Sequence, residues 1–167
     1  IKSPVQLLVG MRRMLPMKFN NEEVQLLYQR LLGQVLFYPP NVAGWPGGRN
    51  WIDSSSLMYR LRLPRLLQDD ENVNAKPKDD DDTMMGMADK PVRKAGTISV
   101  DIEWPVYISS FSATKKEELL PHIAASLLPY GTIDTTMLNS YIDPSSREKY
   151  IQSVTIQLMS LPEYQLM

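Results

Sequence analysis

Apolar residues in the first third of the chain recur at helical spacing. The first run, from Leu7 to Leu15, follows Ser3-Pro4-Val5-Gln6 and stops at Pro16. Serine and glutamine at this spacing can form a capping box, and proline fits the first turn of a helix. The pattern therefore predicts a helix that begins near Pro4 and ends before Pro16.

Two more helices are expected before residue 69. The second should run from Asn20 or Asn21 to Phe37 or Tyr38, with Gly33 in its interior. The third should begin after Asp53 or Ser54, either of which can cap it, and should kink or end at Pro64.

Residues 98–108 change period, because apolar and polar residues alternate there. Alternation is typical of a half-buried strand, and Pro105 would confine such a strand to a sheet edge. A single strand leaves its backbone groups unpaired, so a partner is needed. The partner is expected either around residues 84–93 or outside this chain.

The last third of the chain predicts helices again. Thr114-Lys115-Lys116-Glu117 and Ser145-Ser146-Arg147-Glu148 both have the pattern of a capping box. Pro121 should kink the first of these two helices, and Pro162 should end the second. A short helix is expected between them, over residues 134–142.

The predicted fold is mainly α, a helical domain of about five to seven helices with a long acidic connector and one short β-ribbon or extended edge strand. Residues 1–68 form the first helical segment, residues 69–97 the connector, and residues 98–167 a strand followed by helices that pack with 1–68 as one domain. The predicted core contains Leu8, Leu27, Leu31, Trp45, Leu61, Ile123, Leu127, Val154 and Leu158.

Composition narrows the possible chemistry. The 167 residues carry a net charge of −1, and they include no cysteine and one histidine, which argues against a zinc site. Residues 1–68 hold nine Lys and Arg against three Asp and Glu, but these are spread over helices, so no nucleic-acid partner is expected. No apolar run approaches the roughly 20 residues of a membrane span. We expect no metal and no cofactor.

The proline- and glycine-rich segment 37–53 is the candidate binding loop, through Asn41, Trp45, Arg49, Trp51 and Asp53. Tryptophan faces can stack on sugar rings or peptide side chains, and arginine can pair with an anionic group. The alternative is a structural clasp in which Trp45 fills the core, Trp51 covers the start of the third helix and Asp53 is only a helix cap. In that case Gly47 or Gly48 should have a positive φ.

Asp101 and Glu103 form an alternative acid/base pair. Two positions on one strand face lie about 6.6 Å apart, a separation that could serve general acid and base catalysis. They alternate with apolar residues, however, and so are expected to face water.

Three segments resemble one known family. They are Lys2-Ser3-Pro4-Val5, the run Gly33-Gln34-Val35-Leu36-Phe37 into Pro39-Pro40-Asn41-Val42, and Gly44-Trp45-Pro46-Gly47-Gly48 followed by Trp51. They look like the C-terminal part of the domain of unknown function 1800 family, in its Bacteroidetes-like version. Gln157-Leu158-Met159-Ser160-Leu161-Pro162-Glu163-Tyr164-Gln165 is similar to the end of such proteins.

The resemblance implies a large, mainly helical bacterial protein that is often exported, hence a periplasmic or secreted setting. Genes of the family often lie beside genes for a secreted sulfatase-like family, so such a protein is an expected partner. The family has no established catalytic residues to carry over.

Two functions remain open. The first is a non-catalytic module for binding or assembly within a larger exported protein, because no nucleophile or cofactor motif is present. The second is a fragment of an enzyme acting on polysaccharide or sulfated glycan, with most catalytic groups upstream. In both cases the missing N-terminal part of the same protein is an expected partner, and the isolated fragment should expose apolar surface and self-associate.

Overall fold

The first helix begins and ends where the sequence predicts. In the computed structural model, which describes residues 1–21, 23–68, 100–129 and 138–166, α1 spans Pro4–Met14. The Gln6 amide donates to Ser3 Oγ over 3.3 Å, and the Ser3 amide donates to Gln6 Oε1 over 2.8 Å. The predicted capping box is thus confirmed, and α1 stops before Pro16.

The second helix, α2, spans Glu23–Leu31 and is shorter than predicted. Gly33 does not lie inside it but follows its end, with a φ of +83°. The Gly33 amide donates to Arg30 O and the Gln34 amide to Gln29 O, which is the Schellman pattern of a helix end. The prediction of a helix to Phe37 or Tyr38 was therefore wrong, because glycine in the left-handed conformation ends the helix.

Proline does not end the two helices that contain it. A 3₁₀ turn, η1 (Gly48–Trp51), leads to α3 (Ser54–Gln68), which continues past Pro64. The helix α5 (Lys116–Leu127) likewise continues past Pro121. Each proline removes one backbone donor. Both helices pack against α6, which spans Arg147–Met159.

The predicted strand over 98–108 is mostly wrong. The strand β2 spans only Val100–Ile102 and pairs antiparallel with β1 (Met17–Phe19), Met17 facing Ile102 and Phe19 facing Val100. The partner strand therefore follows α1, whereas residues 84–93 lie outside the described part of the chain.

Residues 104–109 form a helix, α4 (Trp104–Ser109), with Pro105 in its first turn. Proline is accepted there because the first-turn amides need no intrahelical partner. Val106 is consequently exposed, whereas Tyr107 is buried and its hydroxyl accepts a hydrogen bond from Thr155 of α6 over 3.1 Å. The apolar alternation was fortuitous beyond Ile102.

Capping in the last third differs in detail from the prediction. Thr114 does not cap α5, because the N-cap of this helix is Lys115. The Thr114 hydroxyl instead lies 3.3 Å from His122 Nδ1. For α6, Ser146 accepts from the Lys149 amide over 3.1 Å, so the cap lies one residue later than the predicted box. Of the predicted helix at 134–142, the described residues contain η2 (Asn139–Tyr141), and η3 (Pro162–Gln165) follows α6.

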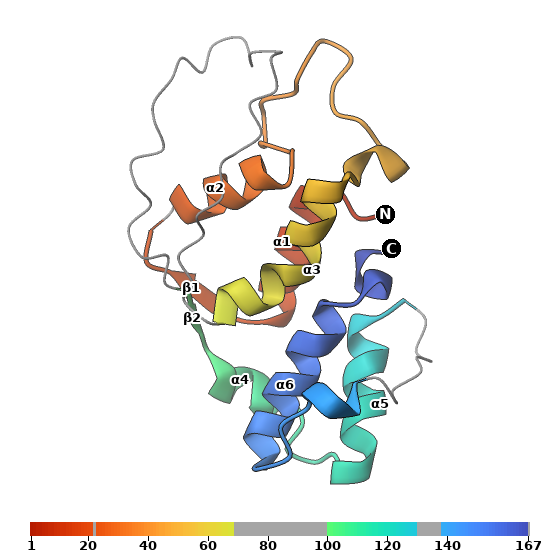
Figure 1. Cartoon of the computed structure of the whole chain (residues 1–167). Helices are drawn as coiled ribbons and strands as arrows, with labels where there is room; N and C mark the ends of the chain where they lie inside the picture. Colours follow the sequence, from red (N-terminus) through yellow and green to blue (C-terminus); the bar gives the residue numbers. More distant parts are fainter. Residues whose placement is uncertain (22, 69–99, 130–137, 167) are drawn as a thin grey trace.

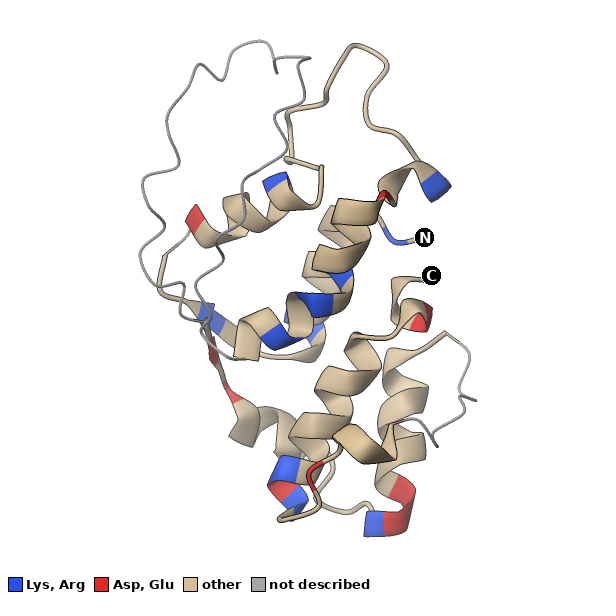
Figure 2. Ribbon diagram, viewed as in Figure 1, with Lys and Arg blue, Asp and Glu red and all other residues tan. Residues whose placement is uncertain are grey.

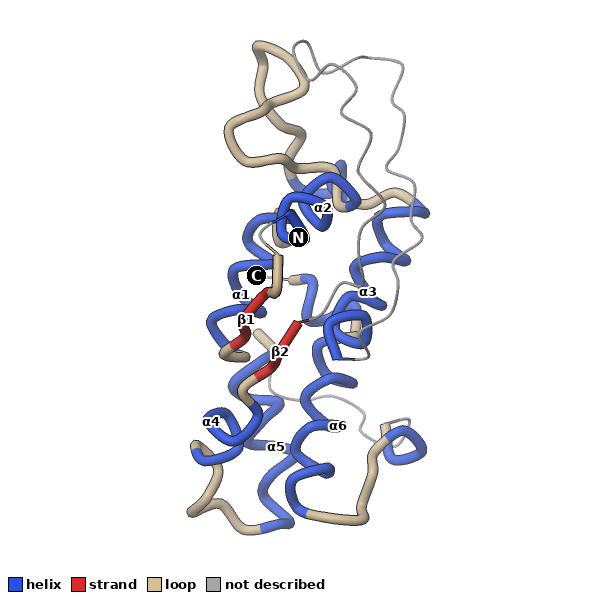
Figure 3. Tube along the Cα trace, turned by 90° about the vertical axis from the view of Figure 1, so that its left-hand side faces the viewer, coloured by secondary structure: helices blue, strands red, loops and turns tan. Residues whose placement is uncertain are grey.

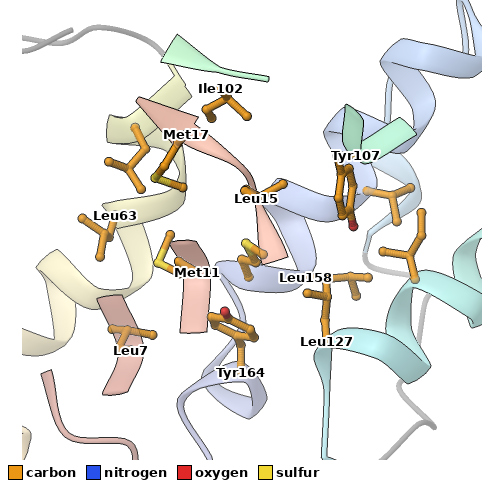
Figure 4. Close-up of a cluster of buried hydrophobic side chains, with 14 of the residues drawn as sticks. Leu7, Met11, Leu15, Met17, Leu63, Ile102, Tyr107, Leu127, Leu158 and Tyr164 are labelled. Carbon is orange, nitrogen blue, oxygen red and sulfur yellow. The ribbon is translucent and has the colours of Figure 1, made fainter. Parts of the chain in front are cut away.

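The core joins the two ends of the sequence. Helices α1 to α3 with the β-ribbon lie on one side and α4 to α6 on the other, and the N- and C-terminal segments meet between them (Figure 1). Side chains from β1, β2 and nearly every helix converge in one cluster (Figure 4). The predicted core residues Leu27, Leu31, Ile123, Leu127, Val154 and Leu158 are buried in it. Leu8 packs against it, but Leu61 and Trp45 are only partly buried and lie outside it.

The mainly α prediction is confirmed, since the described residues contain six α-helices and a two-stranded sheet. The predicted acidic connector, residues 69–97, lies outside the described residues. None of the helices in the described part is both long and apolar enough for a membrane span. Lys and Arg residues occur on several elements rather than on one (Figure 2).

Candidate functional site

The loop between α2 and η1 projects beyond the helices (Figure 1), as the view from the side also shows (Figure 3). Its base is built by local hydrogen bonds. The Tyr38 amide donates to Val35 O over 2.9 Å, and the Leu36 amide donates to Gln29 Oε1 at the end of α2 over 2.8 Å. Val35 itself is buried, so the base is anchored while the residues after it turn outward.

The outer part of the loop, residues 36–42, carries apolar side chains into solvent, and we call it the apolar tip. Phe37 is 84% exposed and Val42 is fully exposed, while Leu36 and Tyr38 are each a little under half exposed. Single exposed apolar residues are ordinary, but four within seven positions of one projecting loop are typical of an interaction site.

Phe37 also has an unusual backbone. Its φ is +68°, and among the described residues no other residue except glycine has a positive φ. It occupies the third position of the turn from Val35 to Tyr38, which in a type II turn is normally glycine or asparagine. A bulky residue in this conformation costs on the order of 1–3 kcal/mol. The molecule thus accepts strain at the position where an aromatic ring is held in water.

Phe37→Asn should raise the free energy of unfolding by about 1 kcal/mol, because asparagine tolerates a left-handed backbone and little buried surface is lost. Leu36→Asn, one residue earlier, has no such strain to release and serves as the matched control. Urea unfolding of the three proteins measures the difference. A destabilisation by Phe37→Asn would mean that the ring packs on the loop and is not held free.

The second half of the loop contains the residues predicted as a binding platform. Asn41 is used locally, since its Oδ1 accepts from the Ala43 amide over 2.9 Å. Gly44 and Gly48 have φ values of +89° and +59°, which confirms the prediction of a positive φ at Gly47 or Gly48. Arg49 is exposed in η1.

Of the two tryptophans in the loop, Trp51 is the buried one, whereas the clasp alternative predicted burial of Trp45. Trp45 is only partly buried and lies outside the core cluster, whereas Trp51 is 8% exposed. Trp51 ends η1 directly before α3, and its carbonyl accepts from Ser56 Oγ over 3.2 Å. Trp45 lies between Gly44 and Pro46. The prediction that Trp45 fills the core was therefore wrong, and Trp51 is the buried tryptophan of this loop, at the start of α3.

The carboxylates named from the sequence have structural partners. Asp53 Oδ1 accepts from the Ser55 and Ser56 amides over 2.8 and 2.9 Å, so Asp53 caps α3. Glu103 pairs with Lys18 on the neighbouring strand, and this contact raises the pKa of Lys18. Asp101 is exposed and faces Lys18 in the ribbon register. Both carboxylates of the predicted pair thus lie beside Lys18 in the ribbon. In the described part of the chain no three His, Asp or Glu side chains group as a metal site would require.

Sequence reasoning missed the apolar tip and one further residue, Arg60. The tip had a visible signal in Phe37-Tyr38-Pro39-Pro40, but we expected Phe37 and Tyr38 to end a helix. Arg60 lies on α3 with no exposed surface, although arginine is rarely buried without a partner. Nothing in its sequence surroundings indicates burial.

One family model matches the chain. It is described as protein of unknown function (DUF1800), and it matches residues 1–166. No curated protein and no solved structure matches the chain.

Proposed function

Because this chain belongs to the family described as protein of unknown function (DUF1800), we propose that it is a helical binding or assembly module. The proposed setting is the C-terminal part of a larger exported bacterial protein, of the Bacteroidetes-like version of the family. The apolar tip, residues 36–42, is the proposed docking element.

The observation that carries this proposal is the strained and exposed Phe37. Strain persists where the surrounding structure over-determines it, and such positions cluster at functional sites. Here Gln29 accepts from the Leu36 amide and Val35 is buried, so the first half of the turn is fixed. An aromatic ring on a preformed loop loses little conformational entropy when it is buried by a partner. Aromatic residues are also those that most often dominate binding free energy at interfaces.

The proposed partner surface is apolar and belongs to a protein. Phe37, Val42, Leu36 and Tyr38 offer mainly apolar contact area, and the neighbouring Pro39 and Pro40 restrict the backbone. Two binding partners with such a surface are proposed: the upstream part of the same polypeptide and a secreted sulfatase-like protein.

Thiol labelling tests the proposal, because the chain contains no cysteine. Phe37→Cys places a thiol in the apolar tip, and Val106→Cys places one on α4, at the other end of the molecule, as the control. In the isolated chain both thiols should react with a maleimide at similar rates. In cells that produce the full-length protein, the thiol at position 37 should react at least about tenfold more slowly.

The same measurement distinguishes the two proposed binding partners. Protection in the purified full-length protein alone identifies its upstream part, whereas protection that appears only when the sulfatase-like protein is added identifies that partner. Equal reactivity at positions 37 and 106 in every setting, cells included, would reject the apolar tip as a docking element.

A further inference from the structure

Arg60 is a buried cation at the place where the two ends of the sequence meet. It lies on α3 and is 0% exposed. Its Nη1 donates to the Lys2 carbonyl over 3.0 Å and to Gln165 Oε1 over 3.3 Å. The Lys2 amide in turn donates to the Gln165 carbonyl over 2.8 Å. The termini lie side by side at this point (Figure 1 and Figure 3).

The rest of the guanidinium has no acceptor. Neither Nε nor Nη2 finds a hydrogen-bond partner among the described residues. These two nitrogens form the side-on edge of arginine, a planar fork that matches two oxygens of a carboxylate, sulfate or phosphate group. Nη1 already holds the group in a fixed orientation, so the fork is preorganised.

A second buried donor is also unsatisfied. Gln165 is 4% exposed, and its Nε2 has no acceptor in the described part of the chain. Its Oε1 accepts from Arg60, which assigns the orientation of the amide and leaves the NH₂ group beside the guanidinium. Buried donors without partners are rare in native proteins, and here three occur on two side chains that touch each other.

The surroundings are electropositive. Lys2 lies against the same segment, because its Nζ donates to the Tyr164 carbonyl over 2.6 Å and lies 3.9 Å from the centre of the Tyr164 ring. Burial lowers the pKa of Arg60 and of Lys2, and no carboxylate among the described residues counteracts this shift for either group. Arg60 is thus a buried cation with no carboxylate partner among the described residues, an arrangement that an anion would stabilise.

We propose that Arg60 and Gln165 form a binding site for one oxyanion. Two of its oxygens accept from Nε and Nη2 of Arg60, and Gln165 Nε2 donates to one of them. The ligand is either a carboxylate carried by a polypeptide or a free sulfate or phosphate, which share this acceptor geometry. Entry requires that residues 1–3 separate from residues 162–166, and one backbone hydrogen bond and the contacts of Lys2 join these segments. The proposal is independent of the apolar tip.

The test is a titration of the chain with sodium acetate, sodium sulfate or sodium phosphate against sodium chloride at matched ionic strength. The resonance of the Arg60 Nε–H group in ¹⁵N-edited NMR should shift saturably, and Tm should rise by about 3–6 °C at ten times the dissociation constant. Tighter binding of acetate indicates a polypeptide carboxylate as the natural ligand. Tighter binding of sulfate or phosphate indicates a free anion.

Three variants separate the site from general salt effects, since sulfate and phosphate stabilise many proteins. Arg60→Met should abolish the saturable response, and Gln165→Met should weaken binding about tenfold. Arg65→Met removes a cation from the exposed side of the same helix and should bind as the unmodified chain does. If Arg60→Met does not fold, the anion responses of Gln165→Met and Arg65→Met still test the site, because only Gln165→Met should bind more weakly. No saturable response to any of the three anions, or an equal response in Gln165→Met, would overturn the proposal.

Discussion

Trp51→Ala is expected to lower the free energy of unfolding by about 3–5 kcal/mol, the usual loss when a large buried aromatic side chain is removed. Trp51 is 8% exposed and joins η1 to the start of α3. Trp45→Ala is the matched variant on the same loop, and it should cost only about 1–2 kcal/mol because Trp45 is only partly buried.

Urea unfolding of both variants at neutral pH measures the two losses. The contrast tests which tryptophan closes the loop against the helices, a question that the sequence left open. Equal losses in the two variants, or a larger loss for Trp45→Ala, would contradict the structural assignment. A small loss for both would mean that the loop contributes little to folding.

The second large effect is expected at alkaline pH. Burial raises the pKa of Tyr28 to about 12 and that of Tyr164 to about 12, from an ordinary value of 10.0. The folded protein therefore retains two protons that the unfolded chain releases between about pH 10 and pH 12. Since the unfolded state binds fewer protons there, stability must fall as pH rises. At about 1.4 kcal/mol per pKa unit, the two groups together remove about 4 kcal/mol by about pH 11.5 and about 5 kcal/mol by about pH 12.

Tyr28→Phe provides the control for this prediction. The buried Tyr28 hydroxyl has no hydrogen-bond partner among the described residues, so its removal should leave stability at pH 7 unchanged or slightly higher. The variant should lose about half of the alkaline effect, because only Tyr164 then remains to ionise with the same shift. Urea unfolding at pH 9 and at pH 11.5, with tyrosinate absorbance followed in parallel, measures both quantities. A stability that is flat across this range would contradict the assigned burial of the tyrosines.

Helix starts with a local cause could be predicted from the sequence. The capping box of Ser3 and Gln6 and the cap at Asp53 consist of hydrogen bonds between residues that lie three positions apart. The partners can therefore be recognised from a short stretch of sequence. The same reasoning failed at Thr114, which lies near His122 instead of capping α5. A motif shows which hydrogen bond can form, but competing partners decide whether it does.

Whether a segment forms a helix or a strand was predictable only where its apolar residues fitted one period, about 3.6 or about 2 residues, and not the other. Between residues 98 and 108, alternation fitted a strand, while Pro105 fitted the first turn of a helix equally well. The change from β2 to α4 depends on β1, which lies more than 80 positions earlier and pairs with only three residues. Gly33 was similarly ambiguous, because glycine can lie within a helix or end it, and its positive φ decided for the end.

The candidate loop was likewise predictable from the sequence only in part. The proline and glycine content of residues 37–53 indicated a specified loop, and the positive φ at Gly48 followed from its chemistry. Which side chains the loop exposes did not follow, because Trp51 is buried next to α3 whereas Phe37 is held in solvent. The position of Trp51 at the start of α3 agrees with the clasp alternative, whereas the exposure of Phe37 was not predicted.

The sequence by itself determined the mainly helical class, most of the core stripe, the capped start of α1 and the position of the loop rich in proline and glycine. These depend on periodicity and on contacts between near neighbours, which are encoded within one or two helical turns. Tertiary structure alone decided that β1 pairs with β2, that Trp51 rather than Trp45 is buried, and that Arg60 lies between Lys2 and Gln165. The physical reason is that burial and strand pairing are properties of two segments together, and the segments that meet here come from opposite ends of the chain.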